Sequence, residues 1–359
     1  MINYQDFKKL NIINKIKYPN LYIKHKLMIF NNKTKKIIHD YLDNLYKYFN
    51  EKDIIILNNS KPLPIKYKAY KYKNNIKSYI NVILLKELNC YLNIWDILVN
   101  PSRKVRIGNK LYFFNKKNKN LLKSKIINNT TSKGRILKFF FYKKKNIIKN
   151  NFKLKNKLFK YGKYILHQNT YKKKKININN YFNTYSKKIG SILLPTSGTY
   201  LNKNIFLKLK IKNVNILKIT YHLNFNRYFK FNFNTFYNNI YLNNEHLIIK
   251  KKTVKKINNL RKKNIKICSI GSNTLRSIES LILLKYNIIP YNNYIKKMLP
   301  FPYKYKFFNS LLTYFNDFNT FNFIILLNMC GFKYTYIIYL EAIKNNYKFN
   351  LYGDLLLII

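Results

Sequence analysis

The sequence predicts an α/β protein, with a discontinuous mixed α/β main domain, barrel-like, that carries an inserted small β-barrel domain. Strand and helix patterns alternate from residue 181 to the C-terminus, which is typical of repeated βα units. Short β-rich runs separated by turn residues fill residues 63–150 instead. Pro62 and Pro64, which are unsuited to a helix interior, stand where the first change of pattern occurs. We therefore predict a main domain of residues 1–62 and 152–359 and an inserted domain of residues 63–151.

The N-terminal elements follow from hydrophobic periodicity. Residues 21–59 predict a strand, a turn, a strand, a short helix and a final strand, DIIILNN. The inserted domain shows five further β-rich runs, and Trp95 is expected in its core. These runs are residues 81–88, 95–99, 110–114, 123–129 and 135–142. No long helical period intervenes, so a small barrel or sandwich fits this region best.

The C-terminal half predicts alternating strands and helices. The predicted strands are residues 189–195, 214–223 and 265–271, and 351–359 closes the chain. The predicted helices are residues 202–213, 251–264, 272–284 and 334–346. Residues 143–180 are rich in Lys and Asn and are interpreted as a basic connector. This connector is either a mobile segment that touches RNA or an expanded loop, and we favour the loop slightly.

The charge of the chain points to a polyanionic partner. The net charge is +58 at pH 7, so nucleic acid is the expected partner and its binding should depend strongly on salt. The alternative is a solvated surface enriched in Lys, a residue whose codons are rich in A and T. No uncharged apolar run reaches the roughly 18–20 residues of a membrane-spanning helix, and the nearest is residues 321–332. Three distant cysteines, Cys90, Cys268 and Cys330, indicate a reducing compartment and no metal site.

Two loops share one pattern, in which an apolar strand stops, a short polar turn follows and a helix begins. They are ILLP-TSG at 192–198 and ICSIG-SNT at 267–274. Helix N-termini offer free N–H groups to anions, so we expect both loops at the C-terminal edge of one sheet, framing a ligand pocket. Ser272 or Asn273 can cap the second helix. Gly198 would allow close approach of a ligand or, alternatively, permit a positive-φ turn.

Taken in order, these pieces resemble one family, the S-adenosylmethionine:tRNA ribosyltransferase-isomerases of queuosine synthesis. In the N-terminal half the resemblance rests on KYPNLY (17–22) and on residues 31–64 and 81–113. In the C-terminal half it rests on YFNTYSKKIGSILLPTSGTY (181–200), ITYH (219–222), NNE (243–245), ICSIGSNTLRSIES (267–280), NSLLTYF (309–315) and NYKFNLYGDLLLI (346–358). The shared order of these motifs carries the resemblance, because no single motif is decisive.

The resemblance implies the same division into a large α/β domain and a smaller inserted β-barrel. It also implies a reaction with S-adenosylmethionine as co-substrate and no metal. The ribosyl part moves to the aminomethyl nitrogen of a 7-deazaguanine at the tRNA wobble position and rearranges. Epoxyqueuosine forms, and adenine and methionine are released. The implied partner is therefore tRNA, contacted in its anticodon region, and we expect a cytoplasmic monomer with no membrane attachment.

This chemistry needs a base for a proton made acidic by the sulfonium and a proton donor for the departing adenine. The chain offers only twelve Asp plus Glu and five His. The resemblance implies catalytic roles for four of them, which are His222, Glu245, Glu279 and Asp354. It implies that the cofactor-binding residues are Thr196, Ser197, Gly198, Gly271, Ser272 and Arg276. Structural roles are the alternatives: His222 as a strand-end residue, an Arg276–Glu279 pair on one helix face, and Asp354 as a capping carboxylate.

The sequence departs from the family at several positions. Tyr200 stands where the family usually has histidine, and Asn224 and Asn226 stand where it usually has glycines. Lys61 and Lys66 replace arginines, which loses bidentate phosphate geometry. The alternative function is therefore a basic RNA-binding protein that keeps the fold and has lost catalysis. An enzyme needs a convergent site, with Thr196, Gly198, His222 and Glu245 at its centre.

Overall fold

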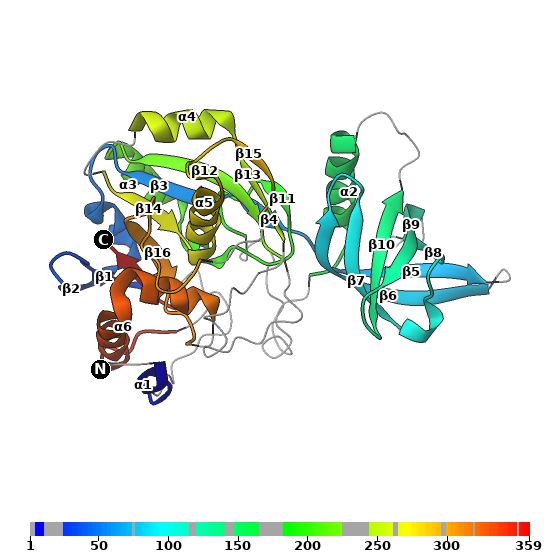
Figure 1. Ribbon diagram of the computed structural model, residues 1–359, viewed down its shortest axis with the longest axis horizontal. Helices are drawn as coiled ribbons and strands as arrows, with labels where there is room; N and C mark the ends of the chain where they lie inside the picture. The colour runs from blue at the N-terminus through cyan, green and yellow to red at the C-terminus, as the bar shows by residue number, and fades with distance from the viewer. Residues whose placement is uncertain are drawn as a thin grey trace.

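The computed structural model describes residues 4–10, 24–73, 76–114, 120–140, 147–164, 182–224, 244–260, 265–295, 299–318, 320–349 and 352–359. KYPNLY, Asn226 and residues 143–146 and 165–180 of the predicted connector lie outside these described residues. Figure 1 shows a large sheet with its helices beside a small barrel with one helix.

Six antiparallel strands close the small barrel in the order β10-β7-β6-β5-β8-β9. They are β5 (Lys66–Lys73), β6 (Ile76–Asn89), β7 (Ile94–Asn100), β8 (Lys110–Phe114), β9 (Asn120–Asn129) and β10 (Gly134–Phe140); a single 3-10 turn, η2 (Ser102–Lys104), follows β7. Alternate side chains of each strand point inward, and Trp95 is fully buried among Ala69, Val82 and Leu111 as expected. The β-rich character predicted for residues 81–142 is thus confirmed, and β5 is an additional strand.

Helix α2 (Ile147–Tyr161) corrects the interpretation of residues 143–180 as a connector. Leu154 and Leu158, one helical turn apart, are buried in the same hydrophobic cluster as the barrel interior. Lys155 Nζ also lies 2.8 Å from Glu87 Oε2 of β6, in a buried ion pair. The predicted domain boundary at 151/152 falls inside this helix. The division into domains stays a prediction, and the packing favours a boundary after Tyr161.

Nine strands form the large sheet in the order β15-β13-β12-β3-β14-β16-β17-β1-β2. They are β1 (Lys26–Phe30), β2 (Ile37–Tyr41), β3 (Ile54–Asn58), β12 (Asn215–His222), β13 (Glu245–Ile249), β14 (Ile267–Ile270), β15 (Tyr291–Ile295), β16 (Ser310–Tyr314) and β17 (Leu355–Ile358). The strands β12, β3, β14 and β16 run parallel to one another. The sheet joins both ends of the chain, because β1 pairs with β17. The mixed α/β fold class is confirmed.

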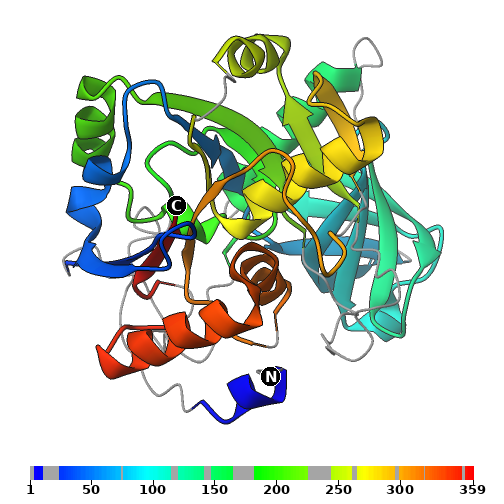
Figure 2. The same cartoon turned by 60° about the vertical axis from the view of Figure 1, so that its left-hand side comes forward.

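Both faces of this sheet are buried at its centre, which explains why the central strands are continuous apolar runs. In β3, Ile54 and Ile56 join one hydrophobic cluster, and Ile55 and Leu57 join the cluster on the opposite face. The first face is covered by α1 (Tyr4–Lys8), α4 (Lys251–Leu260), α5 (Ser272–Lys285) and α6 (Phe321–Lys344). The second face is covered by the 3-10 helix η1 (Leu42–Tyr48) and α3 (Lys203–Ile211). Figure 2 shows η1 and α3 together at the left, away from α5 and α6.

The predicted strands and helices of the main sheet are found near their expected positions, with one instructive exception. The strand expected at 189–195 is only β11 (Lys188–Ser191), and it pairs with β4 (Ser60–Pro62) in a separate two-stranded sheet. A 3-10 turn, η4 (Thr196–Gly198), follows. The strands β13, β15 and β16 were not predicted as strands from the sequence.

Helix α6 is longer than the helix predicted at 334–346. Within the part of the chain that the structure describes, it alone is long and apolar enough to cross a membrane by length and composition. However, 56% of its most apolar window is buried inside the protein. Gly331, with φ 73° and ψ 169°, also interrupts the helical backbone. These features are typical of a core helix.

Candidate active site

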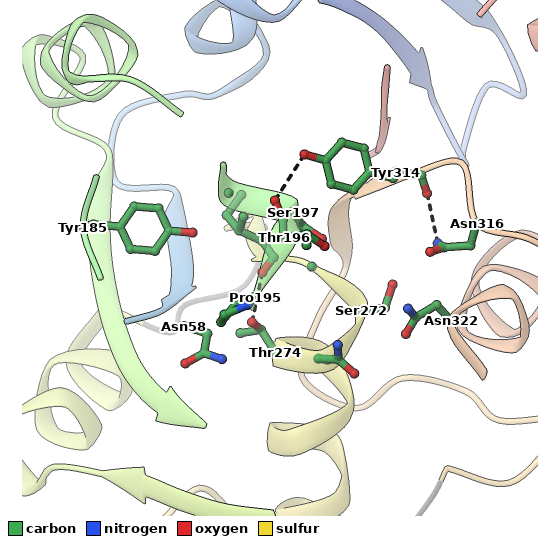
Figure 3. Close-up of a pocket in the computed structure, with 14 residues that line it drawn as sticks. Asn58, Tyr185, Pro195, Thr196, Ser197, Ser272, Thr274, Tyr314, Asn316 and Asn322 are labelled. Carbon is green, nitrogen blue, oxygen red and sulfur yellow. Dashed lines mark hydrogen bonds between the residues drawn. The ribbon is translucent and has the colours of Figure 1, made fainter. Parts of the chain in front are cut away.

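A pocket, whose empty space of about 430 Å³ includes open solvent, lies at the carboxyl ends of three neighbouring parallel strands. Asn58 ends β3, Ile270 ends β14 and Tyr314 ends β16, and all three residues line it. The remaining lining comes from η4, the starts of α5 and α6, and nearby loops: Tyr185, Pro195, Thr196, Ser197, Gly198, Gly271, Ser272, Asn273, Thr274, Asn316 and Asn322. Figure 3 shows hydroxyl and amide groups around this space.

The two loops that the sequence predicted to be neighbours do meet at this pocket. A Cβ atom on Gly271 would lie 2.9 Å from Ser197 Oγ, so the second loop passes directly against the first. Gly271 also has φ +91°, a conformation that favours glycine. The expectation that both loops leave one sheet is wrong, because β14 belongs to the large sheet and β11 to the two-stranded sheet.

Position 198 needs a glycine because the Tyr185 side chain occupies the space that a Cβ atom would take. Neither explanation offered from the sequence describes this contact. A Cβ atom on Gly198 would overlap the Tyr185 hydroxyl and lie 2.6 Å from Tyr185 Cζ. The positive-φ alternative is wrong, because Gly198 is not among the glycines with positive φ. Tyr185 is 6% exposed, and burial raises the pKa of its hydroxyl. Gly198 therefore leaves room for the neutral side chain of Tyr185 in the pocket wall.

The N-terminus of α5 opens onto the pocket. Its N-cap residue is Gly271, which corrects the expectation that Ser272 or Asn273 caps the helix. The N–H groups of Thr274 and Leu275 already bond to the Gly271 carbonyl, at 3.1 and 3.2 Å. The N–H groups of Ser272 and Asn273 precede the first complete helical turn and have no intrahelical acceptor. They are suited to an anionic ligand group such as a carboxylate.

Glu245 and Arg276 form a buried ion pair just behind the pocket. Arg276 Nη2 donates to Glu245 Oε2 at 2.7 Å, and both side chains are about nine-tenths buried. The Tyr221 hydroxyl also donates to Glu245, and burial raises the pKa of this tyrosine well above its ordinary value. Arg276 reaches the pocket-lining Asn273 Oδ1 at 3.4 Å. The Arg276–Glu279 pair, which was the structural alternative for these two residues, is thus replaced by a pair between residues farther apart in the sequence.

His222 lies near the pocket, at the end of β12, which is the neighbour of β3 in the sheet. Its Nδ1 is 2.6 Å from Ser60 Oγ, and the Ser60 N–H donates to the pocket-lining Asn58 Oδ1 at 3.0 Å. A Cβ atom on Gly190 would lie 2.6 Å from His222 Nε2, so glycine leaves room for the ring. Burial lowers the pKa of His222 well below its ordinary value, and the Lys155 charge adds to this effect. The imidazole is therefore neutral at physiological pH.

The buried histidines predict acid destabilisation. Burial, with the Lys155 charge, also lowers the pKa of His246, beside His222, to about 4. Because these pKa values are lower in the folded than in the unfolded state, the stabilisation is complete above pH 6.5 and is lost as pH falls. We expect a loss of about 1.4 kcal/mol per pH unit per histidine, ending near pH 4 for His246. Urea unfolding between pH 7 and pH 5 measures this slope. His246→Gln should reduce it, and equal slopes would contradict the prediction.

Glu279 and Asp354 lie away from the pocket lining, and backbone donors occupy their carboxylates. Glu279 is fully buried and accepts hydrogen bonds from the Tyr303 hydroxyl and from the backbone N–H groups of residues 306–308. Asp354 accepts from the N–H groups of Lys26 and Lys348, both at 2.8 Å. This geometry matches the capping alternative for Asp354. Glu279 thus holds the loop of residues 303–308 to α5, and Asp354 connects residue 348 to β1.

Sequence reasoning missed several pocket residues. Tyr185, Tyr314, Asn58 and Asn316 were not singled out, because Tyr and Asn are so common in this chain that they carry little signal. Tyr314 donates to the Thr196 carbonyl at 3.1 Å and so ties β16 to η4. Tyr200, the replacement for a family histidine, donates to the Tyr352 carbonyl at 2.7 Å and does not line the pocket.

Among the described ranges, no group of three or more His, Cys, Asp or Glu side chains could hold a metal ion. The pocket lining there is also free of carboxylates and imidazoles. It presents neutral hydroxyls, amides and helix N–H groups. Such a lining suits a polar ligand that carries both positive and negative groups.

The fold and the pocket define an α/β protein with a polar pocket at the carboxyl ends of parallel strands, which is where ligands bind in open α/β sheets. Comparison with known proteins gives the family. The family model described as queuosine biosynthesis protein matches residues 21–358, and the chain belongs to this family.

Curated relatives match over nearly the whole chain. The chain is 30% identical over 342 residues to the S-adenosylmethionine:tRNA ribosyltransferase-isomerase of Flavobacterium psychrophilum, with 93% of each chain covered. It is 29% identical over 338 residues to the protein of the same name from Amoebophilus asiaticus, covering 93% of this chain and 92% of that one. A crystal structure of S-adenosylmethionine tRNA ribosyltransferase from Thermotoga maritima aligns over 96% of both chains, at 21% identity and a TM-score of 0.49. The resemblance found in the sequence is confirmed.

Proposed function

We propose that this chain is an S-adenosylmethionine:tRNA ribosyltransferase-isomerase. It transfers and isomerises the ribosyl moiety of S-adenosylmethionine onto 7-aminomethyl-7-deazaguanine at the tRNA wobble position. The products are epoxyqueuosine in tRNA, adenine and methionine. The observation that carries the proposal is the pocket between η4 and α5, built by motif residues of a family that matches the chain from residue 21 to 358.

The pocket is suited to S-adenosylmethionine, whose sulfonium makes the neighbouring ribosyl carbon reactive. In this proposal the Ser272 and Asn273 N–H groups bind the methionine carboxylate. Thr196 and Ser197 supply hydroxyl or backbone groups on the facing loop. Gly271 allows the two loops to approach each other closely, and Gly198 leaves room for the Tyr185 ring in the pocket wall. Arg276 does not line the pocket, and it acts on the ligand indirectly by orienting the side chain of Asn273.

His222 and Glu245 act as positioning residues in this proposal. Each reaches the pocket through a hydrogen-bonded chain that ends on a lining asparagine. The first chain runs from His222 through Ser60 to Asn58, and the second from Glu245 through Arg276 to Asn273. Two amide side chains are thereby held in fixed orientations, which helps to align reacting groups. Glu279 and Asp354 support the site by anchoring loops.

The proposed partner is tRNA, bound through its anticodon region, and the proposed setting is the cytoplasm, with the enzyme acting as a monomer. The charge of +58 supports a polyanionic substrate. The target base must leave its stack to reach a pocket at the strand ends, as in other enzymes that modify bases.

The proposal is tested by incubating the protein with S-adenosylmethionine and a tRNA that carries 7-aminomethyl-7-deazaguanine. Adenine release and the mass of the wobble nucleoside are measured. Asn273→Leu, at the second position of α5, should reduce adenine release about tenfold or more by removing a lining amide. Asn204→Leu, at the exposed second position of α3, is the matched control and should leave the rate unchanged. Binding of tRNA without adenine release would support the alternative of an RNA-binding protein.

A further inference from the structure

The outer face of the barrel carries a row of tyrosines across three adjacent strands. Tyr79 of β6 lies opposite Tyr70 of β5, and Tyr70 lies opposite Tyr112 of β8. Tyr72, two residues further along β5, points to the same side, since side chains alternate along a strand. We call Tyr70, Tyr72, Tyr79 and Tyr112, with Phe114, the tyrosine face.

The rings of the tyrosine face contact one another. Tyr70 and Tyr112 are stacked, with centroids 5.6 Å apart and planes 18° apart. Tyr72 meets Tyr70 edge-on at 5.2 Å and Tyr112 at 5.7 Å. Tyr79 meets Phe114 at 5.9 Å. Cross-strand packing therefore fixes the platform before any ligand binds.

Part of this face remains open to solvent. Tyr72 is 48% exposed and Tyr79 is 62% exposed, whereas Tyr70 is 6% exposed beneath its neighbours. The inward-facing residues of the same strands, such as Ala69 and Leu111, already fill the barrel interior. The exposed rings are thus not needed to complete the barrel core.

The charge around the tyrosine face is positive. Lys77 Nζ lies 5.4 Å from the Tyr70 centroid and 6.0 Å from that of Tyr72, and Lys123 Nζ lies 5.7 Å from that of Tyr112. The acidic residues between 66 and 140 are Glu87 and Asp96, which are 4% and 5% exposed. No carboxylate of the described barrel strands therefore competes with an anionic partner on this surface.

We infer that the tyrosine face is a second RNA-binding site, which stacks unpaired bases of the substrate tRNA while nearby lysines contact its phosphates. Aromatic platforms flanked by basic side chains bind single-stranded RNA in this way, with little sequence preference. Figure 1 shows β8 and the end of the barrel where β5 and β6 meet on the side away from the large sheet. The face would therefore hold a part of the tRNA remote from the reacting base. This inference rests on the proposed function for the identity of the RNA.

A protein partner or a second copy of this chain fits the surface less well. Lysine is depleted in protein–protein interfaces, whereas here lysine side chains lie over the rings themselves. The absence of exposed acidic groups on the described barrel strands would also make two copies repel each other. A ligand that is anionic and stacks on aromatic rings fits both the lysines and the exposed tyrosines.

The test uses the full-length protein and an unmodified tRNA transcript, with binding followed by fluorescence anisotropy. Tyr72→Ala/Tyr79→Ala should weaken binding by about five- to 150-fold for each stacked base. Lys77→Gln should lower the slope of log affinity against log salt by about 0.7. Tyr91→Ala is the matched control, because Tyr91 is 43% exposed in the β6–β7 turn of the same barrel, and it should bind like the wild type.

The kinetics separate this inference from the proposed function. At saturating substrate tRNA, the double tyrosine variant should keep the wild-type kcat for adenine release and show a raised KM for tRNA only. Unchanged affinity, or a loss matched by Tyr91→Ala, overturns the inference. Altered sedimentation of the double variant without altered RNA affinity also overturns it and indicates a protein interface. If the wild type releases no adenine, the proposed function fails. The RNA-binding site is then still tested, because the double tyrosine variant should lose affinity for the tRNA transcript.

Discussion

Replacing Arg276 with Met should destabilise the protein by about 3–5 kcal/mol, because it leaves the Glu245 carboxylate buried without its cation. The Tyr221 hydroxyl and the Asn224 N–H still donate to this carboxylate, but they are neutral groups and cannot replace the guanidinium charge. Urea unfolding monitored by circular dichroism measures the loss. The same variant should weaken S-adenosylmethionine binding, because Asn273 loses a partner that orients it.

A double variant isolates the ionic part of this effect. Glu245→Gln/Arg276→Met should be more stable than Arg276→Met, since the amide needs no counter-charge and can still accept hydrogen bonds. Lys9→Met is the control, because Lys9 pairs with Asp6 at 3.6 Å and is 79% exposed. Breaking an exposed pair changes stability by about 0–1 kcal/mol. If Arg276→Met were no more destabilising than this control, the buried ion pair would not contribute to stability as predicted.

The strands that the sequence predicted well are those buried on both faces. DIIILNN and ICSIG are continuous apolar runs because β3 and β14 lie between two hydrophobic clusters. Edge strand β15 (Tyr291–Ile295) reads YNNYI and is largely open to solvent, so no apolar pattern marks it. β5 reads KYKAYKYK, in which basic and aromatic residues conceal a strand that buries Tyr67 and Ala69.

Helix α2 shows a different limit of sequence reasoning. Its sequence IIKNNFKLKNKLFKY is dominated by Lys and Asn, and this composition is typical of a loop. The signal that could have found it is the spacing of Leu154 and Leu158, one helical turn apart and both buried. In a chain with so many lysines, two apolar residues at helical spacing are better evidence for a helix than the overall polarity of the segment is against it.

The meeting of the two glycine-containing loops could be predicted because each loop has its own local pattern. The partners of Glu245 and Glu279 could not be predicted, because they lie far away in the sequence. Glu245 lies 31 positions before Arg276, and the backbone donors to Glu279 lie 27 to 29 positions after it. Local spacing suggested an Arg276–Glu279 pair, and the tertiary structure gave each residue another partner. Neither helix periodicity nor charge spacing contains this information.

Replacing Gly271 with Ala should reduce S-adenosylmethionine affinity about tenfold or more and destabilise the protein by about 1–3 kcal/mol. The new methyl group would lie 2.9 Å from Ser197 Oγ and 3.1 Å from its Cβ, which pushes η4 away from the start of α5. It would also hold an alanine at φ +91°, which adds backbone strain. Calorimetric titration measures affinity, and urea unfolding measures stability.

Two further variants separate the contact from the backbone strain. Gly108→Ala introduces an alanine at φ +87°, where the Cβ meets nothing within 4 Å, so it should show strain alone and unchanged affinity. Ser197→Gly combined with Gly271→Ala removes the colliding side chain and should restore part of the affinity while the strain remains. If Gly271→Ala bound S-adenosylmethionine as tightly as Gly108→Ala, the space between η4 and α5 would not be the binding site. The expected result is unchanged affinity in Gly108→Ala and reduced affinity in Gly271→Ala, because the two glycines have a similar positive φ and only Gly271 faces the pocket.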